Sequence, residues 1–495
     1  MNLALAIDFG STFTKGSLFD LAERRVLGIA YEPSTVGTDV SIGLRAVLLG
    51  LSHLTALPMS RIPARVCSSA AGGLRVAVIG LVPSLSLEAA QRAALGAGAK
   101  IIGAYGHKMS QAALSALEKS RPDLILLAGG IDGGDEETIL HNARALSRVQ
   151  LRCPIIVAGN QFVAGDCAEI LLSAGCNVTL AANILPEIDR VEVQEVHHLI
   201  RELFVKHITQ AKGIERISDE VNLVAPIIPT PAAVLRACQL LAEGYPGQRG
   251  FGEVIIVDIG GATTDIHSAT DGAPTRPGVL RRGLPELFLK RTVEGDLGVR
   301  INAATIVERS GVETIAALAR QLCSIPQTAA DVLAYVERVS ADPNYVPDNE
   351  KEAALDGAMA HSAIRIAIQR HAGFVKEVYT GAGLAQVQYG KDLGAVSTVV
   401  GVGGVIAYGN HAEFALGGVV ADAGEPQSLA PEHPDILIDR SYLLYAIGLL
   451  AEDQPEIAFN LAKQVLVSSS SMAPQITAGG RERNSISADM RASRE

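Results

Sequence analysis

Residues 7–15 read IDFGSTFTK, and residues 257–265 read VDIGGATTD. In both stretches an apolar strand ends at an aspartate, Asp8 or Asp258, and glycine and hydroxyl residues follow at once. Glycine lets the main chain come close to a bound phosphate, and backbone amides together with hydroxyls form an anion-binding turn. The aspartate can hold Mg²⁺ through water. Two such hairpins facing each other predict donors and carboxylates on both sides of a nucleotide triphosphate.

A third glycine-rich stretch lies later in the chain. Residues 399–409 read VVGVGGVIAYG, an apolar strand that runs into G-x-G-G and then a helix. The three stretches, in this order, resemble the phosphate-1, phosphate-2 and adenosine motifs of the actin-like ATPase superfamily. The resemblance implies an α/β protein with two ribonuclease H-like domains, a nucleotide cleft between them, and ATP and Mg²⁺ as ligands. Each stretch alone is also compatible with an ordinary β-turn.

The resemblance gives roles to individual residues. Asp8 and Asp258 take the metal-shell positions, and with Asp265 they form the candidate catalytic set. The candidate nucleotide-binding residues are Gly10, Ser11, Thr12, Lys15, Gly260, Gly261, Thr263, Thr264, Gly401, Gly403 and Gly404. Lys15 has a second interpretation as a surface charge, because alternation from Asp8 places it on the opposite face of the sheet unless the turn resets the register.

The sequence does not single out a residue that positions the attacking water. Residues 227–237, IIPTPAAVLRA, resemble the superfamily's connect-1 segment, but Ile228 stands where a glutamate or glutamine is expected. Asp265, Glu294 and Asp296 are candidate substitutes, each with the alternative role of a helix cap or a solvated carboxylate. We therefore expect a slow Mg-dependent ATPase.

Composition narrows the class of protein. A chain of 495 residues exceeds what one hydrophobic core usually serves, so two or more domains are expected. The net charge of −11 at pH 7 argues against a broad nucleic-acid or acidic-membrane surface. The six cysteines contain no C-x-x-C pair, which indicates neither a disulfide framework nor a zinc site. Because no long apolar run occurs, we expect a cytoplasmic protein, and formation of a homo-oligomer stays open.

Hydrophobic patterning, read with the resemblance, predicts three segments. Residues 1–215 open with a β-meander and carry βα units from residue 74 onward, and the resemblance implies that they form the first actin-like domain with these units inserted. Residues 216–467 form the second actin-like domain, with a strand near 376–383 and a final helix over 442–467. Residues 468–495, rich in Ser, Gly and Arg, have little to bury and are predicted to be a disordered tail.

Two features of the inserted units have alternative interpretations. The stretch LLAGGIDGGDEETI, residues 126–139, indicates either a second ligand or partner surface at a strand end, or a helix whose acidic start complements its own dipole. His107 lies in GAYGHKMS, which resembles the D-x-H-x-x-G motif of cobalamin-binding domains only faintly, since Tyr105 and Ser110 break the pattern. We read His107 as a loop histidine.

Within the superfamily, the chain resembles the glutamate mutase accessory proteins, called MutL or GlmL and unrelated to the mismatch-repair protein. The resemblance rests on AIDFGSTFTKGSLFDL, LLAGGIDGGDEETI and VIIVDIGGATTDIHS, and covers most of residues 1–465. It implies a chaperone-like reactivating factor that binds ATP and ADP, whose partners are the subunits of an adenosylcobalamin-dependent mutase, and in which ATP turnover drives the exchange of inactivated cobalamin. The alternatives are a small-molecule kinase of the sugar-kinase type, and a scaffold that binds ATP with negligible hydrolysis.

Overall fold

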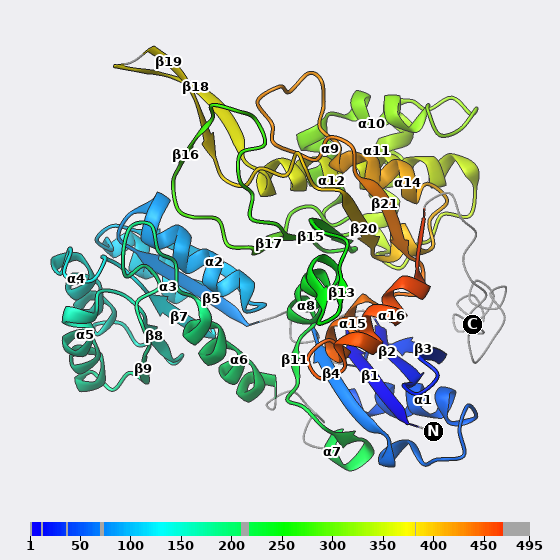
Figure 1. Cartoon of the computed structure of the whole chain (residues 1–495), viewed down its shortest axis with the longest axis horizontal. Helices are drawn as coiled ribbons and strands as arrows, with labels where there is room; N and C mark the ends of the chain where they lie inside the picture. Colours follow the sequence, from blue (N-terminus) through cyan, green and yellow to red (C-terminus); the bar gives the residue numbers. More distant parts are fainter. Residues whose placement is uncertain are drawn as a thin grey trace.

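The computed structural model describes residues 2–10, 13–35, 38–69, 74–208, 217–381 and 383–468 (Figure 1). Ser11 and Thr12 of the first predicted phosphate loop lie outside these residues, as does nearly all of the predicted tail.

The first sheet starts at the N-terminus with a meander of three antiparallel strands. β4 then pairs with β1 in parallel, and two short strands from much later in the chain pair with β4. The strands are β1 (Leu3–Phe9), β2 (Phe13–Asp20), β3 (Arg25–Pro33), β4 (Pro63–Ser68), β10 (Asn222–Leu223) and β11 (Ile228–Pro229). α1 (Val40–Ser52), capped by Asp39, packs on β2 and β3 through its apolar face.

The second sheet repeats this order of strands. β14, β15 and β17 form an antiparallel meander, and β20 and β21 then extend it in parallel beside β14. The strands are β14 (Val254–Ile259), β15 (Thr264–Ala269), β17 (Leu289–Glu294), β20 (Thr398–Val402), β21 (Asp435–Asp439) and β22 (Leu466–Ser468). The order third-second-first-fourth-fifth in both sheets is that of a ribonuclease H-like domain. The predicted fold class, two ribonuclease H-like domains of the actin-like ATPase type, is confirmed.

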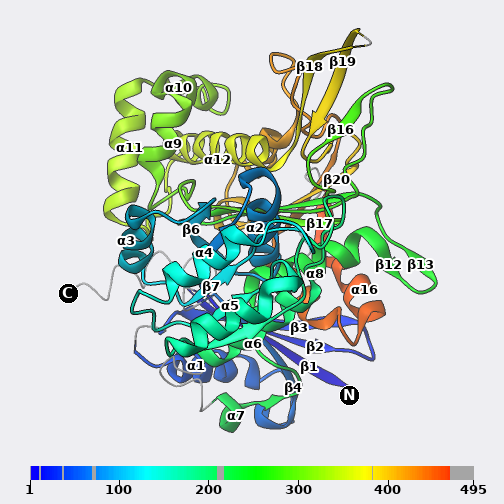
Figure 2. The same cartoon turned by 90° about the vertical axis from the view of Figure 1, so that its left-hand side faces the viewer.

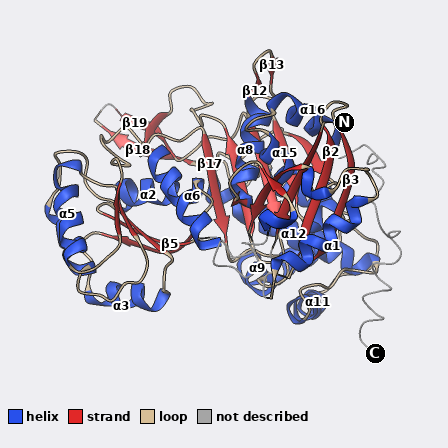
Figure 3. Ribbon diagram, turned by 90° about the horizontal axis from the view of Figure 1, so that it is seen from below, coloured by secondary structure: helices blue, strands red, loops and turns tan. Residues whose placement is uncertain are grey.

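The inserted βα units form a third, wholly parallel sheet in the order β6-β5-β7-β8-β9. Helices lie on its faces, and it stands apart from the two main sheets at the left of Figure 1 and of Figure 3. Its strands are β5 (Arg75–Gly80), β6 (Lys100–Gly106), β7 (Leu124–Leu127), β8 (Ile155–Val157) and β9 (Val178–Leu180). Its helices are α2 (Glu88–Gly96), α3 (Gln111–Ser120), α4 (Glu137–Leu146), α5 (Gln161–Ser173) and α6 (Gln194–Ile208). We call residues 74–208 the insertion.

Three helices from distant parts of the chain fill the space between the two main sheets. They are α8 (Thr230–Glu243), α15 (Leu444–Leu450) and α16 (Pro455–Val465). Their apolar side chains form one core with strands of both sheets, so the second half of the chain returns to pack on the first. The predicted single helix over 442–467 is wrong: it breaks before Pro455, which begins a new helix because proline lacks the N–H that a helix interior needs, and the chain ends in β22.

The boundary predicted between residues 215 and 216 lies outside the described residues. The first sheet includes residues up to Pro229, because β10 and β11 both pair with β4. Shorter elements of this region are η1 (Met59–Arg61), η2 (Pro83–Leu87), α7 (Ile217–Glu220), β12 (Gly244–Tyr245) and β13 (Gln248–Arg249).

The second domain carries a helical layer and a projecting ribbon. The predicted strand near 376–383 is the first arm of a hairpin, which with β16 makes a three-stranded ribbon that stands out from the body (Figure 2). The ribbon strands are β16 (Leu280–Arg282), β18 (Phe374–Thr380) and β19 (Gly383–Tyr389). The helices are α9 (Ala303–Ser310), α10 (Val312–Ala319), α11 (Ala329–Ala341), α12 (Glu350–His371), α13 (Gly404–Ala407), α14 (Ala412–Leu416) and η4 (Gly417–Val419).

Candidate functional site

The two aspartate hairpins have the same geometry. The amide of Gly10 donates to the carbonyl of Phe13 at 2.9 Å, and the amide of Gly260 donates to the carbonyl of Thr263 at 2.9 Å. In the first hairpin Asp8 lies opposite Lys15, and in the second Asp258 lies opposite Asp265. Because directly opposed residues point to the same face of a sheet, each hairpin presents a pair of charged side chains on one face.

Asp8 is only 2% exposed and accepts several contacts. The hydroxyl of Thr230 donates to its Oδ1 at 2.6 Å, the thiol of Cys67 lies 3.5 Å from the same oxygen, and the Lys15 ammonium is 3.5 Å from Oδ2. The turn has therefore reset the alternation, and Lys15 lies on the face of Asp8 instead of the opposite one. The interpretation of Lys15 as a surface charge does not fit the structure, because its side chain is only 18% exposed.

Tyr442 completes the surroundings of Lys15. The Lys15 ammonium lies 3.7 Å from the centre of the Tyr442 ring, a cation–π contact. Tyr442 lies in the loop between β21 and α15 and has a positive φ of 59°. Burial raises the pKa of its hydroxyl, and the negative charges of Asp258 and Asp8 add to this effect. Tyr442 is thus within electrostatic reach of both hairpins.

Asp258 is the carboxylate of the site that lacks a cation of its own. Among the described residues no ion pair to it is found. Burial is the main reason that its pKa is raised to about 7, and the charges of Asp265 and Asp8 add to the rise while Lys15 and Arg291 oppose it. Lys15 and Asp8 of the first hairpin are therefore within electrostatic range of Asp258 in the second, and a nucleotide site shared by the two hairpins stays a prediction.

Asp265 is held by an arginine that the sequence analysis missed. Arg291, on β17 and 6% exposed, donates to Asp265 Oδ1 from Nη2 at 2.6 Å and from Nε at 2.9 Å. The hydroxyl of Thr263 donates to Oδ2 at 3.2 Å. Both oxygens of Asp265 are therefore occupied, which fits a structural anchor for the loop better than a free base. The sequence analysis did not predict β17 as a strand of this sheet, so the stretch FLKRTVE did not point to Arg291.

The remaining loop residues differ in what surrounds them. Thr264 is fully buried and its hydroxyl donates to the Leu297 carbonyl at 2.8 Å, so it faces away from an incoming ligand. The carbonyl of Gly261 accepts from the amides of Arg300 at 3.0 Å and Ile301 at 2.8 Å, which fixes the second loop against the segment before α9.

Three glycines of the predicted adenosine motif have three different environments. Gly403 has a φ of 114°, and a Cβ there would lie 2.0 Å from the Ile259 carbonyl, so only glycine fits. Gly404 is exposed and a Cβ would meet nothing within 4 Å, as a position open to a ligand requires. A Cβ at Gly401 would lie 2.4 Å from Leu416, so its small size serves packing between β20 and α14.

The candidate substitutes for the connect-1 acid do not reach Asp8. Ile228 is 7% exposed and pairs with Cys67 inside the sheet, whereas the nearby Thr230 is the connect-1 residue that contacts Asp8. Glu294 and Asp296 both pair with Arg370. The hydrogen bond from Arg370 lowers the pKa of Asp296, while burial raises that of Glu294.

The carboxylates present fit a magnesium ion held partly by the nucleotide. In the described ranges no group of three or more His, Cys, Asp or Glu side chains is placed to hold a metal by itself. Mg²⁺ is usually bound by one or two carboxylates, substrate phosphates and several waters, so it does not need such a cage. Asp258, half-buried and without an ion pair among the described residues, is the residue that fits this role best.

The two features of the insertion have simple explanations. Asp135 caps α4 by accepting from the amide of Thr138 at 2.9 Å, in line with the dipole interpretation of the acidic stretch. His107 has a φ of 64° and its carbonyl accepts from Asn142 at 3.0 Å, which makes it a turn residue.

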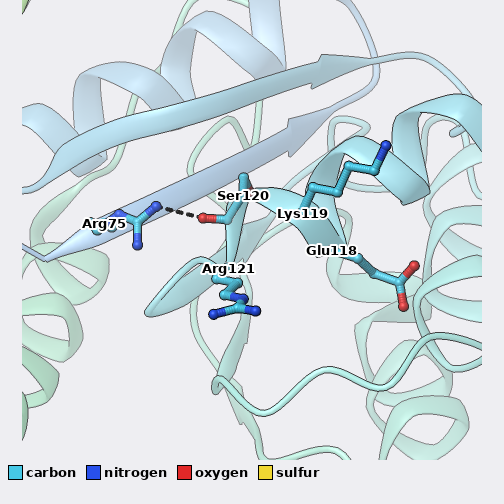
Figure 4. Close-up of a pocket in the computed structure, with 5 residues that line it drawn as sticks. All are labelled: Arg75, Glu118, Lys119, Ser120 and Arg121. Carbon is cyan, nitrogen blue, oxygen red and sulfur yellow. Dashed lines mark hydrogen bonds between the residues drawn. The ribbon is translucent and has the colours of Figure 1, made fainter.

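A hollow of about 490 Å³ lies in the insertion, at the amino ends of its parallel strands and beside the start of β5. It is lined by Arg75, Glu118, Lys119, Ser120 and Arg121 (Figure 4). Arg75 Nη2 donates to the Ser120 carbonyl, so its charge is turned toward a helix end. Ligands of parallel α/β sheets bind beyond the carboxyl ends of the strands, and this hollow is at the other edge.

No described helix is both long and apolar enough to cross a membrane. The predicted cytoplasmic location stays a prediction.

Comparison with known proteins gives one family. The model of the family described as "MutL protein" matches residues 4–466. The chain is 40% identical over 468 residues to the protein named "Protein MutL" of Clostridium tetanomorphum, and the match covers 94% of this chain and 100% of that protein.

Solved structures of similar fold are distant. Component A of the (R)-2-hydroxyglutaryl-CoA dehydratase of Acidaminococcus fermentans is 9% identical with a TM-score of 0.30, over 93% of this chain and 97% of that one. Xylulose kinase from Bifidobacterium adolescentis is 10% identical with a TM-score of 0.31, over 99% of both chains. At these scores no argument rests on either structure.

Proposed function

The chain belongs to the MutL protein family, and from this membership and the geometry of the two hairpins we propose that it is a slow Mg-dependent ATPase that reactivates an adenosylcobalamin-dependent mutase of the glutamate mutase type. The observation that supports it best is that Asp8 with Lys15, from one ribonuclease H-like sheet, acts electrostatically on Asp258 from the other. Charged groups from distant parts of the chain that meet in one place and perturb a pKa mark a candidate ligand site.

In this proposal each hairpin has its own task. Asp8 and Asp258 hold Mg²⁺ through water, and Lys15 contributes positive charge toward the phosphates. The glycine-rich loops would present backbone amides and hydroxyls to them. Mg²⁺ held by the two aspartates would supply positive charge that offsets the charge developing on the phosphates. Gly403 and Gly404 let the main chain lie against adenosine.

We expect slow hydrolysis because Asp258, the one carboxylate near Asp8 without a described ion pair, is assigned to Mg²⁺ in this proposal, and no further acid among the described residues is placed to act as a base. Connect-1 offers the apolar Ile228 and the hydroxyl of Thr230, and Asp265 is bound on both oxygens by Arg291 and Thr263. Water is then oriented without a dedicated base, and general base catalysis typically contributes about 10²–10⁴-fold. A slow cycle suits a protein that changes the shape of a partner instead of turning over a metabolite.

The mutase partner is proposed from family membership. An actin-like ATPase closes on ATP and opens after hydrolysis, so a partner that touches both domains is strained and released once per cycle. The helices α8 and α15 that join both sheets in one core are suited to carry such a movement. The strained mutase would exchange inactivated cobalamin for adenosylcobalamin.

A single assay separates this function from the alternatives. Phosphate release from ATP and Mg²⁺ is measured for the protein alone, with a panel of metabolites, and with an inactivated mutase plus fresh adenosylcobalamin. Release and recovery of mutase activity that both require ATP support the proposal. ADP formation that requires a metabolite would replace it with a small-molecule kinase, and tight ATP binding without release in any mixture would replace it with a scaffold. The committed state of Asp265 is the observation that favours the scaffold as second candidate.

A further inference from the structure

Arg291 contacts more than the second hairpin. While Nε and Nη2 hold Asp265, Nη1 donates to the carbonyls of Leu95 and Ala99, both at 3.3 Å. Leu95 lies in the last turn of α2, the first α-helix of the insertion, and Ala99 lies in the turn that follows this helix. The last carbonyls of a helix carry partial negative charge, so the buried guanidinium stabilises that of Leu95, which also accepts from the amide of Gly98 at 2.9 Å. One side chain thus joins the second hairpin to the insertion.

The same end of α2 also contacts the segment beside the first hairpin. Gly98 has a φ of 93°, and a Cβ there would lie 2.7 Å from Pro229 and 3.5 Å from Ala232. Between these two residues stands Thr230, whose hydroxyl holds Asp8. Residues 95–99, which comprise the end of α2 and the turn after it, are therefore linked to the second hairpin through Arg291, and to the first through Pro229 and its neighbour Thr230.

A second set of contacts anchors the insertion without involving the hairpins. Arg92 donates to the Pro285 carbonyl at 2.8 Å and to Glu286 at 2.7 Å, and the Glu286 side chain is only 2% exposed. Lys290 lies 3.6 Å from Glu286. The insertion is therefore docked on the second domain by a buried ionic contact, and the end of α2 is the part of that interface that reaches the candidate nucleotide site.

From this geometry we propose that residues 95–99, gripped by Arg291, report the state of the nucleotide site to the insertion, so that ATP binding changes how the insertion is held. The inference rests on the proposed function, because it takes ATP as the ligand of the two hairpins. Arg291 acts as a positioning residue: it does not touch the nucleotide, but a shift of Asp265 moves the guanidinium and with it the carbonyls of α2. A partner that binds the insertion would then respond to its movement.

Two variants test the connection from its two ends, each with a matched control. Arg291→Lys keeps a cation beside Asp265 but has a single amine, which cannot replace three separate contacts. Gly98→Ala introduces a Cβ against Pro229 from the insertion side. Its control is Gly175→Ala, also in the insertion and at a φ of 80°, where a Cβ meets nothing within 4 Å. Arg92→Gln is the control for Arg291→Lys, because it weakens docking without touching Asp265.

The experiment has two measurements on the full chain. Calorimetric titration with ATP and Mg²⁺ gives the affinity of each variant. Hydrogen exchange of the peptide 88–99 is then compared with and without saturating nucleotide. We expect a nucleotide-dependent change of exchange in the wild type and in Arg92→Gln that Arg291→Lys loses. Because coupling is reciprocal, Gly98→Ala should change ATP affinity by about fivefold or more, the lower end of typical coupling between sites, and Gly175→Ala should not.

The outcomes separate this inference from the proposed function. If the wild type binds ATP but exchange in 88–99 does not respond, or if Arg291→Lys responds like the wild type, the inference is overturned and the ATPase assignment stands. If the wild type gives no heat with ATP, the proposed function fails and the inference with it. Should Arg291→Lys fail to fold, Gly98→Ala and Gly175→Ala decide alone: equal ATP affinities in these two variants refute the connection.

Discussion

Replacement of Asp258 by asparagine should stabilise the nucleotide-free protein while it abolishes the binding of Mg-ATP. The pKa of Asp258 is raised from 3.8 to about 7 in the folded protein, mainly by burial and then by the charge of Asp265. As pH rises from about 4 to 7, the unfolded chain releases this proton and the folded chain keeps it. The folded state therefore loses stability over that window, and the loss is complete above pH 7.

The size of the effect follows from the shift. Each pKa unit corresponds to about 1.4 kcal/mol, so a shift of about three units sets an upper limit near 4 kcal/mol. Because part of the burial penalty relaxes through solvent, we expect about 2 kcal/mol in favour of Asp258→Asn at pH 8. At pH 4 the two proteins should be nearly equally stable, because Asp258 is protonated in the folded wild type.

Differential scanning calorimetry at pH 4, 6 and 8, with and without Mg-ATP, measures both halves of the prediction. The wild type should unfold at a higher temperature when Mg-ATP is added, and Asp258→Asn should show no such increase. Asp265→Asn is the control: it removes the partner of the buried Arg291 guanidinium and should lower the unfolding temperature at pH 8. The reasoning is refuted if Asp258→Asn is less stable than the wild type at pH 8, or if its advantage does not grow with pH.

Three further predictions concern residues of different kinds. Lys15→Met should weaken Mg-ATP binding by at least about tenfold in a titration, because a phosphate loses a close cation, whereas Met in place of the exposed Lys119 should have no effect. Gly403→Ala should cost at least about 2 kcal/mol in denaturant unfolding, since its φ of 114° and the nearby Ile259 carbonyl exclude a Cβ, and Gly404→Ala, which has open space, should cost much less. Burial lowers the pKa of His197 to about 4, so the folded state takes up fewer protons than the unfolded one below about pH 6.5. Between pH 7 and pH 5 the wild type should then lose about 2 kcal/mol of its free energy of unfolding relative to His197→Leu. Equal denaturation midpoints for the two proteins at both pH values would contradict this.

The fold was readable because its signals are local. Each hairpin places an aspartate, a glycine turn and a returning strand within nine residues, and the βα units of the insertion alternate at regular spacing. Pattern and turn chemistry fix such elements without knowledge of their neighbours. The same reasoning failed at residues 442–467, where apolar periodicity continues across the break at Pro455 and only the contact of β22 with β21 shows that the chain has become a strand.

The sequence singled out the two aspartates, whose role as a nucleotide site stays a prediction, and it did not indicate the residues that contact the hairpins. Arg291, Thr230 and Tyr442 reach the hairpins from a strand, a helix start and a loop that are remote in sequence, so no spacing within a motif indicates them. Lys15 was left between two interpretations for a related reason. Simple alternation assigns a face along one strand, but the turn between Gly10 and Phe13 sets the register across two strands, and only the paired positions decide the face.

The comparison of the two hairpins explains why one fold, used twice, yields a site with two unlike sides. Lys15 and Asp265 occupy equivalent positions opposite Asp8 and Asp258. In the first hairpin the opposed pair has opposite charges, Lys15 and Asp8. In the second the opposed pair is doubly negative, and Arg291 from the third strand pairs with Asp265, so that Asp258 is the carboxylate we propose for a metal ion. The same arginine also connects the second hairpin to α2, because its third guanidinium nitrogen, Nη1, is not used by Asp265.

A lysine at position 265 would pair with Asp258 and release Arg291. The variant Asp265→Lys should therefore lose both Mg²⁺-dependent ATP binding and the response of residues 88–99 in hydrogen exchange. If Asp265→Lys kept the response of residues 88–99 to nucleotide, the site and the insertion would be connected by some other route.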